Sequence, residues 1–247
     1  MARLWRAYHP GLPAQAGAEV ELTGEEAHHV GRVLRLAPGD RLSLFDGAGR
    51  VWEAVIQAAP SRRVLARLDR ERTEPVESPL ELRLYQGLCR AERMDWLVQK
   101  GTEIGLAAIH PLPTARSERA RADGKRLERW RRIAVEAAKQ CGRRRLPEIA
   151  PRDDLPELRS EEGPGLLLDP GPGSRALGSL LGELAPGPVR LAVGPEGGFA
   201  ADEIERWSAS GWRRAEIGPR TLRAETAGLV AAAVILHAWG DLGAARR

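Results

Sequence analysis

The chain has 247 residues, 43% of them hydrophobic and 29% charged, with a formal net charge of +4. This composition is typical of a globular protein and excludes a wholly disordered chain. No apolar run approaches the roughly 20 residues that a membrane-spanning helix needs, and the first residues lack the apolar stretch of a signal peptide. We therefore expect a cytoplasmic protein of one large or two modest domains, with no membrane contact.

The two cysteines, Cys89 and Cys141, lie far apart and form no C-x-x-C pair. A disulfide framework or a structural zinc site would need more cysteines or a closer spacing. We therefore expect neither, and no metal. Folding must then rest on the burial of apolar side chains, for which a chain of this length is sufficient.

The first 74 residues are dominated by short β-strands. Apolar and polar residues alternate over 41–45, and Asp46-Gly47 then supplies a turn. Further strands are predicted over 51–56 and 64–68. A small β-barrel-like domain is the expected result.

One helix interrupts these strands. Thr23 and Glu26 have the spacing of a capping box, which predicts a helix that starts here and continues to about residue 35. Val30 and Val33 follow at helical spacing, so we expect both side chains to face the core.

The polar, proline-punctuated segment 74–79 marks a domain boundary, so the domains are predicted to span 1–74 and 75–247. Beyond this segment strands alternate with helices, which implies a mostly parallel sheet covered by helices. The strands are expected over 80–86, 109–112, 166–168, 189–193 and 215–217, and the helices over 92–103, 123–140, 204–207 and 225–239.

Two of these predicted helices carry clear apolar stripes. Trp96 lies on the stripe of the helix over 92–103, and Trp130 on that of the helix over 123–140. We therefore expect both indole rings in the core. Gly105 is expected to end the first of the two helices, because glycine readily adopts the left-handed conformation of a helix C-terminus.

Positive charge is concentrated in residues 116–145, which hold twelve Lys/Arg against four Asp/Glu. A basic block inside a folded protein is typical of contact with a polyanion such as nucleic acid. A helix face that is simply solvated produces the same pattern, and the charge count alone does not separate the two interpretations.

Two glycine-containing loops follow predicted strands, at the sheet edge where open α/β sheets bind ligands. The first, residues 194–198, reads GPEGG and lacks the lysine of a phosphate-binding loop. The carboxylate of Glu196 would repel a phosphate, so a phosphate-free, cationic ligand suits this loop better. The glycines by themselves favour the simpler interpretation of a tight strand-to-helix turn.

The second loop, residues 218–224, joins a predicted strand to the C-terminal helix. Arg220 and Arg223 within it can pair with acidic groups of the protein or reach a nucleic-acid phosphate. Glu225 follows in the first helical turn, where the helix dipole also favours a carboxylate. Together with the segment after the strand that ends at residue 168, these loops would form one pocket.

The loops and several motifs elsewhere resemble one family. GPEGG at 194–198 followed by GPRTLRAETA at 218–227 resembles the signature of the SPOUT superfamily. Within it, the match is to the 16S ribosomal RNA (uracil-N3) methyltransferases, the small subunit methyltransferase E family. Further motifs that resemble this family, spread over nearly the whole chain, lie at residues 6–10, 28–35, 45–47, 93–105, 117–119 and 137–147.

The resemblance implies an N-terminal PUA-like β-barrel joined to a C-terminal SPOUT α/β domain with a deep trefoil knot. It also implies a homodimer that uses S-adenosyl-L-methionine and acts on 16S rRNA or the 30S ribosomal subunit. This cofactor carries a sulfonium charge and no phosphate, in agreement with the argument on Glu196. Cofactor contacts are then expected from Leu168, Gly194, Pro195, Glu196, Gly197, Gly198, Ile217, Gly218, Leu222, Arg223, Thr226 and Ala227.

On this resemblance the basic segment becomes part of an RNA-binding surface. Adjacent residues of a helix point about 100° apart, so His28 and His29 do not act as one catalytic pair. Trp5 and Tyr8, near the N-terminus, are candidates for stacking on a base. The candidate RNA contacts are Arg3, Arg6, His29, Arg32, Arg35, Arg116, Arg119, Arg143 and Arg144.

Methylation at uracil N3 removes a proton and needs an unpaired base. Arg223 is our candidate for the group that stabilises the imide anion, while Glu225 either accepts the proton or only fixes the loop. Two other functions stay open, namely a SPOUT enzyme that methylates a ribose 2′-hydroxyl and a non-catalytic RNA-binding protein. The sequence does not decide whether naked RNA or the 30S subunit is the substrate.

Overall fold

The computed structural model of the chain describes residues 4–60, 62–117, 122–158 and 163–243. The chain divides into two compact units. The first holds the residues up to Glu77 together with Val135–Leu146, and the second holds Ser78–Ala134 and the residues from Pro147 onward. The sequence predicts a boundary at residue 74 and does not foresee that Val135–Leu146 packs with the first unit.

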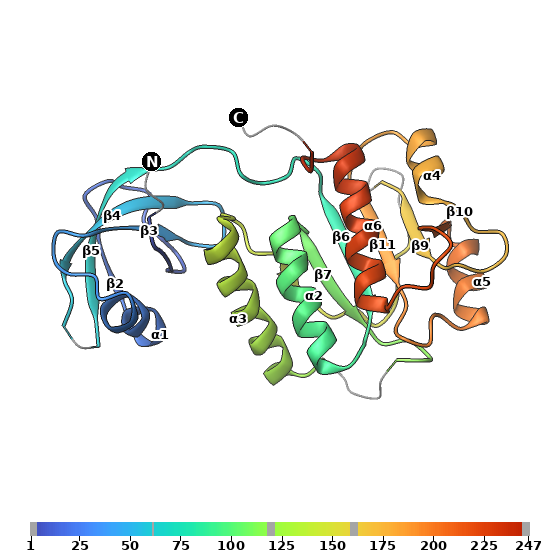
Figure 1. The fold of residues 1–247 in the computed structure, drawn as a ribbon, viewed down its shortest axis with the longest axis horizontal. Coiled ribbons are helices and arrows are strands. Elements are labelled where there is room, and N and C mark those ends of the chain that lie inside the picture. Colours follow the sequence, from blue (N-terminus) through green and yellow to red (C-terminus); the bar gives the residue numbers. More distant parts are fainter. Residues whose placement is uncertain (1–3, 61, 118–121, 159–162, 244–247) are drawn as a thin grey trace. The chain divides into compact units, whose positions relative to one another are not determined.

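The first unit is built on a five-stranded sheet with the strand order β1-β3-β4-β5-β2 (Figure 1). Its strands are β1 (Arg6–Tyr8), β2 (Glu19–Leu22), β3 (Arg41–Phe45), β4 (Val51–Ala58) and β5 (Val64–Glu71). The three longest strands are those predicted from alternation. β1 and β2 are too short to give a periodic signal, and they join the sheet through backbone pairing with β3 and β5.

The helix of this unit is shorter and wound differently than predicted. A regular helix α1 (Gly24–His28) passes into a π-helical turn (His29–Val33), in which the Leu34 amide donates to the carbonyl of His29, 2.9 Å away. Val30 is buried, but the wider π winding changes the direction of the following side chains. Val33, expected in the core, is 59% exposed.

The predicted capping box at this helix is wrong. Thr23 occupies the N-cap position but its side chain makes no capping hydrogen bond. The carboxylate of Glu26 instead accepts from the backbone amide of Tyr8 at 3.1 Å and from Nζ of Lys139 at 2.8 Å. Both partners are distant from Glu26 in the sequence, and their hydrogen bonds take the place of the predicted capping contact.

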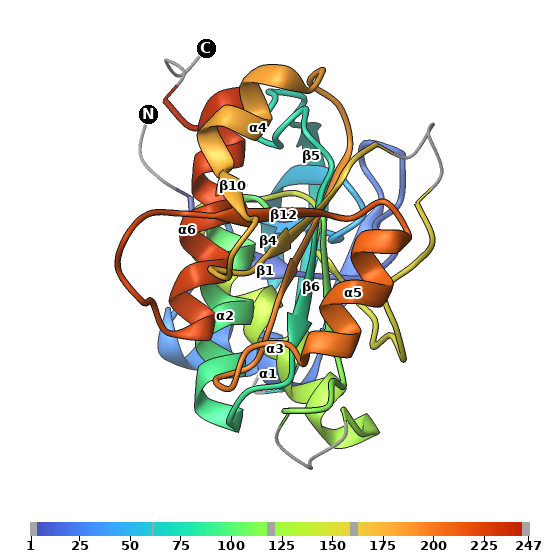
Figure 2. The same cartoon turned by 90° about the vertical axis from the view of Figure 1, so that its right-hand side faces the viewer.

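The second unit is built on a seven-stranded parallel sheet with the order β10-β12-β9-β11-β6-β7-β8. Figure 2 shows α2, α4 and α6 on one face of this sheet and α5 on the other. The strands are β6 (Leu82–Gly87), β7 (Ala108–Leu112), β8 (Glu148–Ile149), β9 (Gly165–Leu168), β10 (Arg175–Ala176), β11 (Val189–Val193) and β12 (Arg213–Glu216). The helices are α2 (Ala91–Ile104), α4 (Leu177–Glu183), α5 (Ala201–Ala209), α6 (Ala224–Trp239) and the part of α3 (Gly124–Cys141) that precedes Val135.

The central strands of this sheet are buried on both faces, as their continuous apolar runs predict. Leu166 and Leu191 pack into the core beneath α2, α4 and α6, whereas their neighbours Leu167 and Ala192 pack toward α5. Gly105 ends α2 in the left-handed conformation, with φ of 104°, as expected. None of the helices in the described ranges is long and apolar enough to cross a membrane.

Candidate active site

Three loops meet at the carboxyl edge of the parallel sheet. β9 lies between β12 and β11 in the sheet, so the segments that follow these three strands are neighbours. They are the segment after Leu168, the glycine loop 194–198 and the loop 217–223 that leads into α6. The three loops that the strand pattern assigns to one pocket are therefore neighbours, and the pocket that they form stays a prediction.

The glycine loop 194–198 folds closely on itself. A Cβ atom at Gly194 would lie 2.9 Å from the carbonyl carbon of Gly198, so no larger residue fits there. Gly198 has φ of +68°, and the space where its Cβ would point is open for 4 Å. The loop thus presents a bare backbone toward an open volume, which is what close approach of a ligand requires.

The carboxylate of Glu196 is turned toward α2. Oε1 accepts from Nη1 of Arg93 at 2.8 Å and from the backbone amide of Arg90 at 3.4 Å. Partial burial by itself would raise the pKa of Glu196. Backbone hydrogen bonds and the charge of Arg93 lower it by more, so the pKa of Glu196 lies below its ordinary value. Arg93 thus offsets part of the negative charge that Glu196 brings to the glycine loop.

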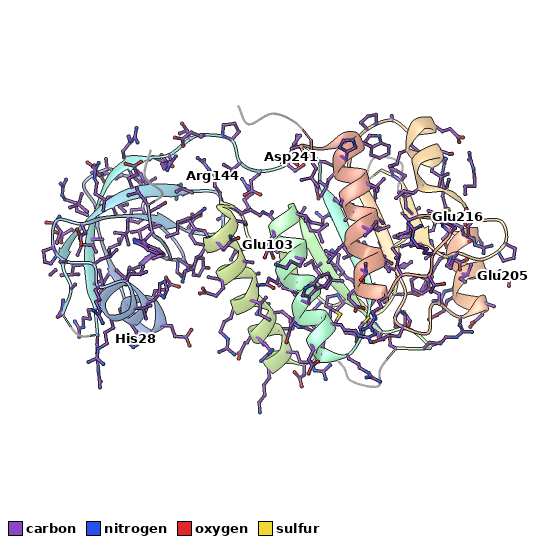
Figure 3. All side chains as sticks on the ribbon, in the orientation of Figure 1. His28, Glu103, Arg144, Glu205, Glu216 and Asp241 are labelled. Carbon is purple, nitrogen blue, oxygen red and sulfur yellow. The ribbon has the colours of Figure 1, made fainter. Side chains whose placement is uncertain are left out.

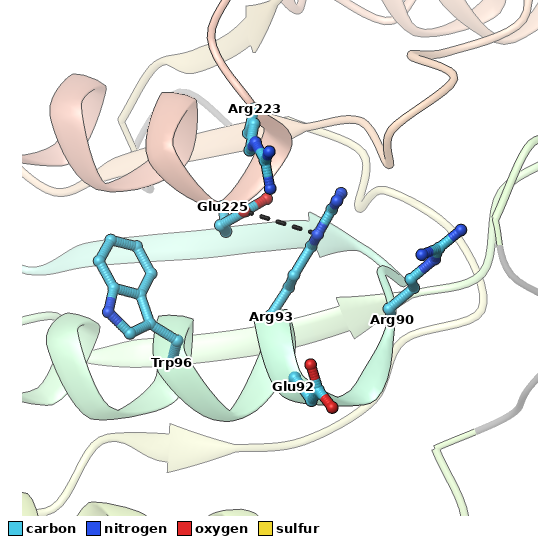
Figure 4. A pocket seen from close by; sticks show the side chains of 6 residues that line it. All are labelled: Arg90, Glu92, Arg93, Trp96, Arg223 and Glu225. Atoms are coloured by element: carbon cyan, nitrogen blue, oxygen red, sulfur yellow. Dashed lines mark ion pairs between the residues drawn. The ribbon is translucent and has the colours of Figure 1, made fainter.

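A cavity of about 290 Å³ lies between the N-terminal turns of α2 and α6. Figure 4 shows Arg223 reaching toward Glu225 from the loop before α6, and Arg93 reaching toward it from α2. The two residues expected to carry the chemistry, Arg223 and Glu225, thus line one pocket. Its walls are formed by Arg90, Glu92, Arg93, Trp96, Arg223 and Glu225.

Glu225 is the most deeply placed of these side chains, with 7% of its surface exposed. Its Oε1 lies 3.6 Å from Nε of Arg93. Its Oε2 is buried and has no hydrogen-bond partner among the described residues. A buried carboxylate oxygen normally has a donor, so this one is suited to receive a hydrogen bond from a bound molecule.

Cys89, next to this pocket, is unsuited to nucleophilic chemistry. Burial, together with the charges of Glu196 and Glu225, raises the pKa of the Cys89 thiol to about 12. The thiol is therefore protonated at neutral pH, and only the thiolate is a strong nucleophile. Across the described parts of the chain, no group of three or more His, Cys, Asp or Glu residues is arranged to hold a metal ion.

Comparison with known proteins identifies the family. The RNA methyltransferase domain family matches residues 76–236, and the RNA methyltransferase PUA domain matches residues 22–69. Ribosomal RNA small subunit methyltransferase E of Bacillus subtilis is 31% identical over 227 residues, which are 87% of this chain and 89% of that relative. The chain belongs to the ribosomal RNA small subunit methyltransferase E family.

Solved structures of similar chains contain the cofactor. A methyltransferase from Legionella pneumophila in complex with SAM is 34% identical, with a TM-score of 0.86 over 97% of this chain and 100% of that one. Methyltransferase E from Neisseria gonorrhoeae, bound to S-adenosyl methionine, is 31% identical with a TM-score of 0.85 over 97% and 99%. The α/β fold with an N-terminal PUA domain is thereby confirmed. The trefoil knot stays a prediction.

The residues present at the three loops fit such a cofactor. Gly198 and Gly218 both leave open space where a side chain would stand, with φ of +68° and +115°. Side chains that are half-buried at the ends of β9 and β12 and at the start of α6 can line an apolar pocket. They are Leu168, Ile217, Leu222, Thr226 and Ala227.

The structure adds pocket residues that sequence reasoning did not single out for chemistry. Trp96, expected in the core, is 43% exposed and lines the pocket, because it lies on the face of α2 that carries Arg93 one turn earlier. Arg90, Glu92 and Arg93 are the other additions. Arg93 and Trp96 belong to the motif at 93–105, which resembles the methyltransferase E family, whereas no motif pointed to Arg90 or Glu92.

Three arginines expected to contact RNA are engaged inside the first unit. Arg143 is 7% exposed and its Nη2 lies 2.9 Å from Glu77. Arg144, labelled in Figure 3, donates its backbone amide to Glu77 and pairs with Glu74 at 3.5 Å. Arg6 donates to the carbonyl of Arg143 at 2.7 Å. Internal partners hold these guanidinium groups, and their contact with RNA stays a prediction.

The other RNA candidates lie at several places. Arg116 is exposed and donates to the carbonyl of Gly197 at 2.9 Å, so it supports the glycine loop. In the first unit, Arg32 and Arg35 are exposed and His29 is half-buried. Arg3 and Arg119 lie outside the described residues.

Proposed function

We propose that this chain transfers the methyl group of S-adenosyl-L-methionine to N3 of a uridine in 16S rRNA, in the decoding region of the small subunit. The coarser statement, an S-adenosylmethionine-dependent methyltransferase of small-subunit rRNA, follows from membership of the methyltransferase E family. One observation supports methylation at uracil N3 in particular. A buried, unpartnered carboxylate oxygen of Glu225 lies in a pocket that also holds Arg223.

N3 of uracil carries a proton in neutral solution. Methylation there therefore needs a proton acceptor and a group that stabilises the imide anion. Glu225 supplies the acceptor through Oε2. Arg223 supplies a positive charge close to the developing anion, in a partly desolvated pocket where such charges act strongly. When bound, S-adenosyl-L-methionine supplies an electrophilic methyl group on its sulfonium.

The cofactor is proposed to rest on the three loops at the carboxyl edge of the sheet. The bare backbone of Gly198 permits close approach, and the side chains of Leu168, Ile217 and Leu222 give an apolar lining. Arg116 fixes the loop from outside through the carbonyl of Gly197. In this assignment, α2 and α6 connect the cofactor loops with the pocket that holds Glu225.

We also propose that the enzyme is a homodimer that uses the faces of α2 and α6. Trp96 on α2 and Val230 and Val234 on α6 are large apolar side chains that are exposed in the single chain. The two helices pack against each other, so these side chains belong to one surface. Val234→Asp should convert the dimer to a monomer in sedimentation equilibrium, and a dimer that survives this change would contradict the proposal.

Nucleoside analysis of rRNA treated with the enzyme tests the reaction. Naked 16S rRNA and 30S subunits from cells that lack the modification are incubated with the cofactor, digested and analysed by mass spectrometry. 3-Methyluridine is the expected product, whereas a 2′-O-methyl nucleoside would assign the enzyme to the ribose methyltransferases. Absence of S-adenosylmethionine binding in calorimetry would identify a non-catalytic RNA-binding protein instead.

A further inference from the structure

Arg93, in the first turn of α2, contacts carboxylates from two other segments of the second unit. Its Nη1 donates to Oε1 of Glu196 at 2.8 Å, and its Nε lies 3.6 Å from Oε1 of Glu225. Glu196 belongs to the glycine loop after β11, and Glu225 to the first turn of α6. One side chain thus links the loop assigned to the cofactor with the pocket assigned to the reaction, and Figure 4 shows its contact with Glu225.

The two carboxylate oxygens of Glu225 have different surroundings. Oε1 faces the guanidinium, while Oε2 is buried without a hydrogen-bond partner among the described residues. An oxygen without a donor can accept a hydrogen bond from a ligand. Arg93 therefore places a positive charge beside Oε1 and leaves Oε2 for the ligand.

The geometry of the guanidinium matters as well as its charge. Nε and Nη1 lie in one plane and point in different directions, so a single guanidinium donates to Glu196 through Nη1 and lies within ion-pair distance of Glu225 through Nε. A lysine ammonium at this position has one nitrogen on a flexible stem. It would reach one of the two carboxylates and leave the other without its partner.

We propose that Arg93 is a positioning residue of the methyl transfer. Through Glu196 it holds the cofactor loop, and through Glu225 it aims Oε2 at the N3–H group of the uracil. This inference rests on the proposed function, because it assigns Arg93 a part in that same reaction. It predicts two separable effects, one on cofactor affinity through Glu196 and one on the rate through Glu225.

The test uses Arg93→Ala and Arg93→Lys in the full chain, with Arg83→Ala as the matched control. Arg83 also bridges two carboxylates, with Nε 2.7 Å from Glu81 and Nη1 3.4 Å from Glu148, but at the amino end of β6, away from the loops. Dissociation constants for S-adenosylmethionine are measured by calorimetry. Single-turnover rates are measured at saturating cofactor and RNA, and thermal unfolding shows that each variant is folded.

Arg93→Ala is expected to weaken cofactor binding about 10-fold, as for the loss of one charged hydrogen bond. It is expected to lower the single-turnover rate about 10- to 100-fold, as for a misaligned reacting group. Arg93→Lys should recover one of the two quantities and not both. Arg83→Ala should change neither, and equal effects of Arg83→Ala and Arg93→Ala would overturn the inference.

A double variant isolates the route through Glu225. If Arg93 acts on the rate by orienting Glu225, then Arg93→Ala should cost little further rate in a Glu225→Gln background, while its effect on cofactor affinity persists. Fully additive rate losses would overturn the assignment. A wild-type chain that binds the cofactor but methylates no rRNA would instead overturn the proposed function. The calorimetric effect of Arg93→Ala would still test the link to the loop.

Discussion

Glu77 and Arg143 form an ion pair inside the first unit, although 66 residues separate them. Nε and Nη2 of Arg143 lie 3.0 and 2.9 Å from Oε2 of Glu77. Oε1 of the same carboxylate accepts from the backbone amides of Arg144 and Arg145, at 2.7 and 3.0 Å. One carboxylate therefore fixes the segment that follows α3, through the guanidinium of Arg143 and the backbone amides of Arg144 and Arg145.

Glu77→Ala should lower the free energy of unfolding of this unit by about 3 kcal/mol, because it leaves a buried guanidinium and two amides without their acceptor. Urea unfolding followed by circular dichroism measures the change. Arg63→Ala is the control, because it breaks an exposed pair with Glu21 at 3.5 Å and should cost no more than about 0.5 kcal/mol. Equal losses in the two variants would contradict the structural role of Glu77.

Gly198→Ala should weaken S-adenosylmethionine binding while the fold survives. The added methyl group enters the open space beside the glycine loop and forces an alanine into φ of +68°, which costs about 1–2 kcal/mol. Gly211→Ala is the matched control, since Gly211 has φ of +93° but lies between α5 and β12. Both variants should lose similar stability, and calorimetry should show weaker cofactor binding for Gly198→Ala alone.

Arg223→Ala should lower kcat about 100-fold or more if Arg223 stabilises the imide anion. The defect should shrink as the pH rises, because more uracil is then ionised without help. Arg223→Lys should recover part of the rate, since an ammonium keeps the charge without the planar fork. Single-turnover rates at saturating RNA over a pH series provide the measurement. A pH-independent increase in KM with kcat unchanged would limit Arg223 to binding RNA.

His110 should make the second unit sensitive to mild acid. Its ring is buried, with Nδ1 2.8 Å from the carbonyl oxygen of Ala150. Burial lowers the pKa of His110 below 6.5, although the hydrogen bond to Ala150 opposes this. The unfolded chain therefore binds the proton more readily, so the stability that neutral His110 contributes is complete above about pH 6.5 and is lost as the pH falls below it.

Urea unfolding between pH 7 and 5 tests this assignment. His110→Gln should show a smaller fall in the free energy of unfolding over this range than the unchanged chain. His28→Gln, which alters an exposed histidine of the first unit (Figure 3), is the control. A His110→Gln variant that is as acid-sensitive as the unchanged chain would refute the prediction.

The sequence by itself determined the elements whose signals are local. The apolar runs that became β9 and β11 predict strands buried on both faces, and the turn residues after them predict loops at the carboxyl edge. The start of α6 is predicted within one residue, and Gly105 ends α2 as expected. These features depend on residues a few positions apart, so the order of the chain is enough to reveal them.

Tertiary structure decided which charges are available and which side chains share a pocket. The sequence predicts that Arg143 contacts nucleic acid, but in the structure it pairs with Glu77. The sequence also predicts that Val33 faces the core, but the π-helical turn changes the direction of its side chain. Arg93 and Trp96 enter the pocket because α2 packs against α6, which lies more than 100 residues further along the chain. Such pairings depend on which distant segments meet when apolar surface is buried, and no local pattern records that outcome.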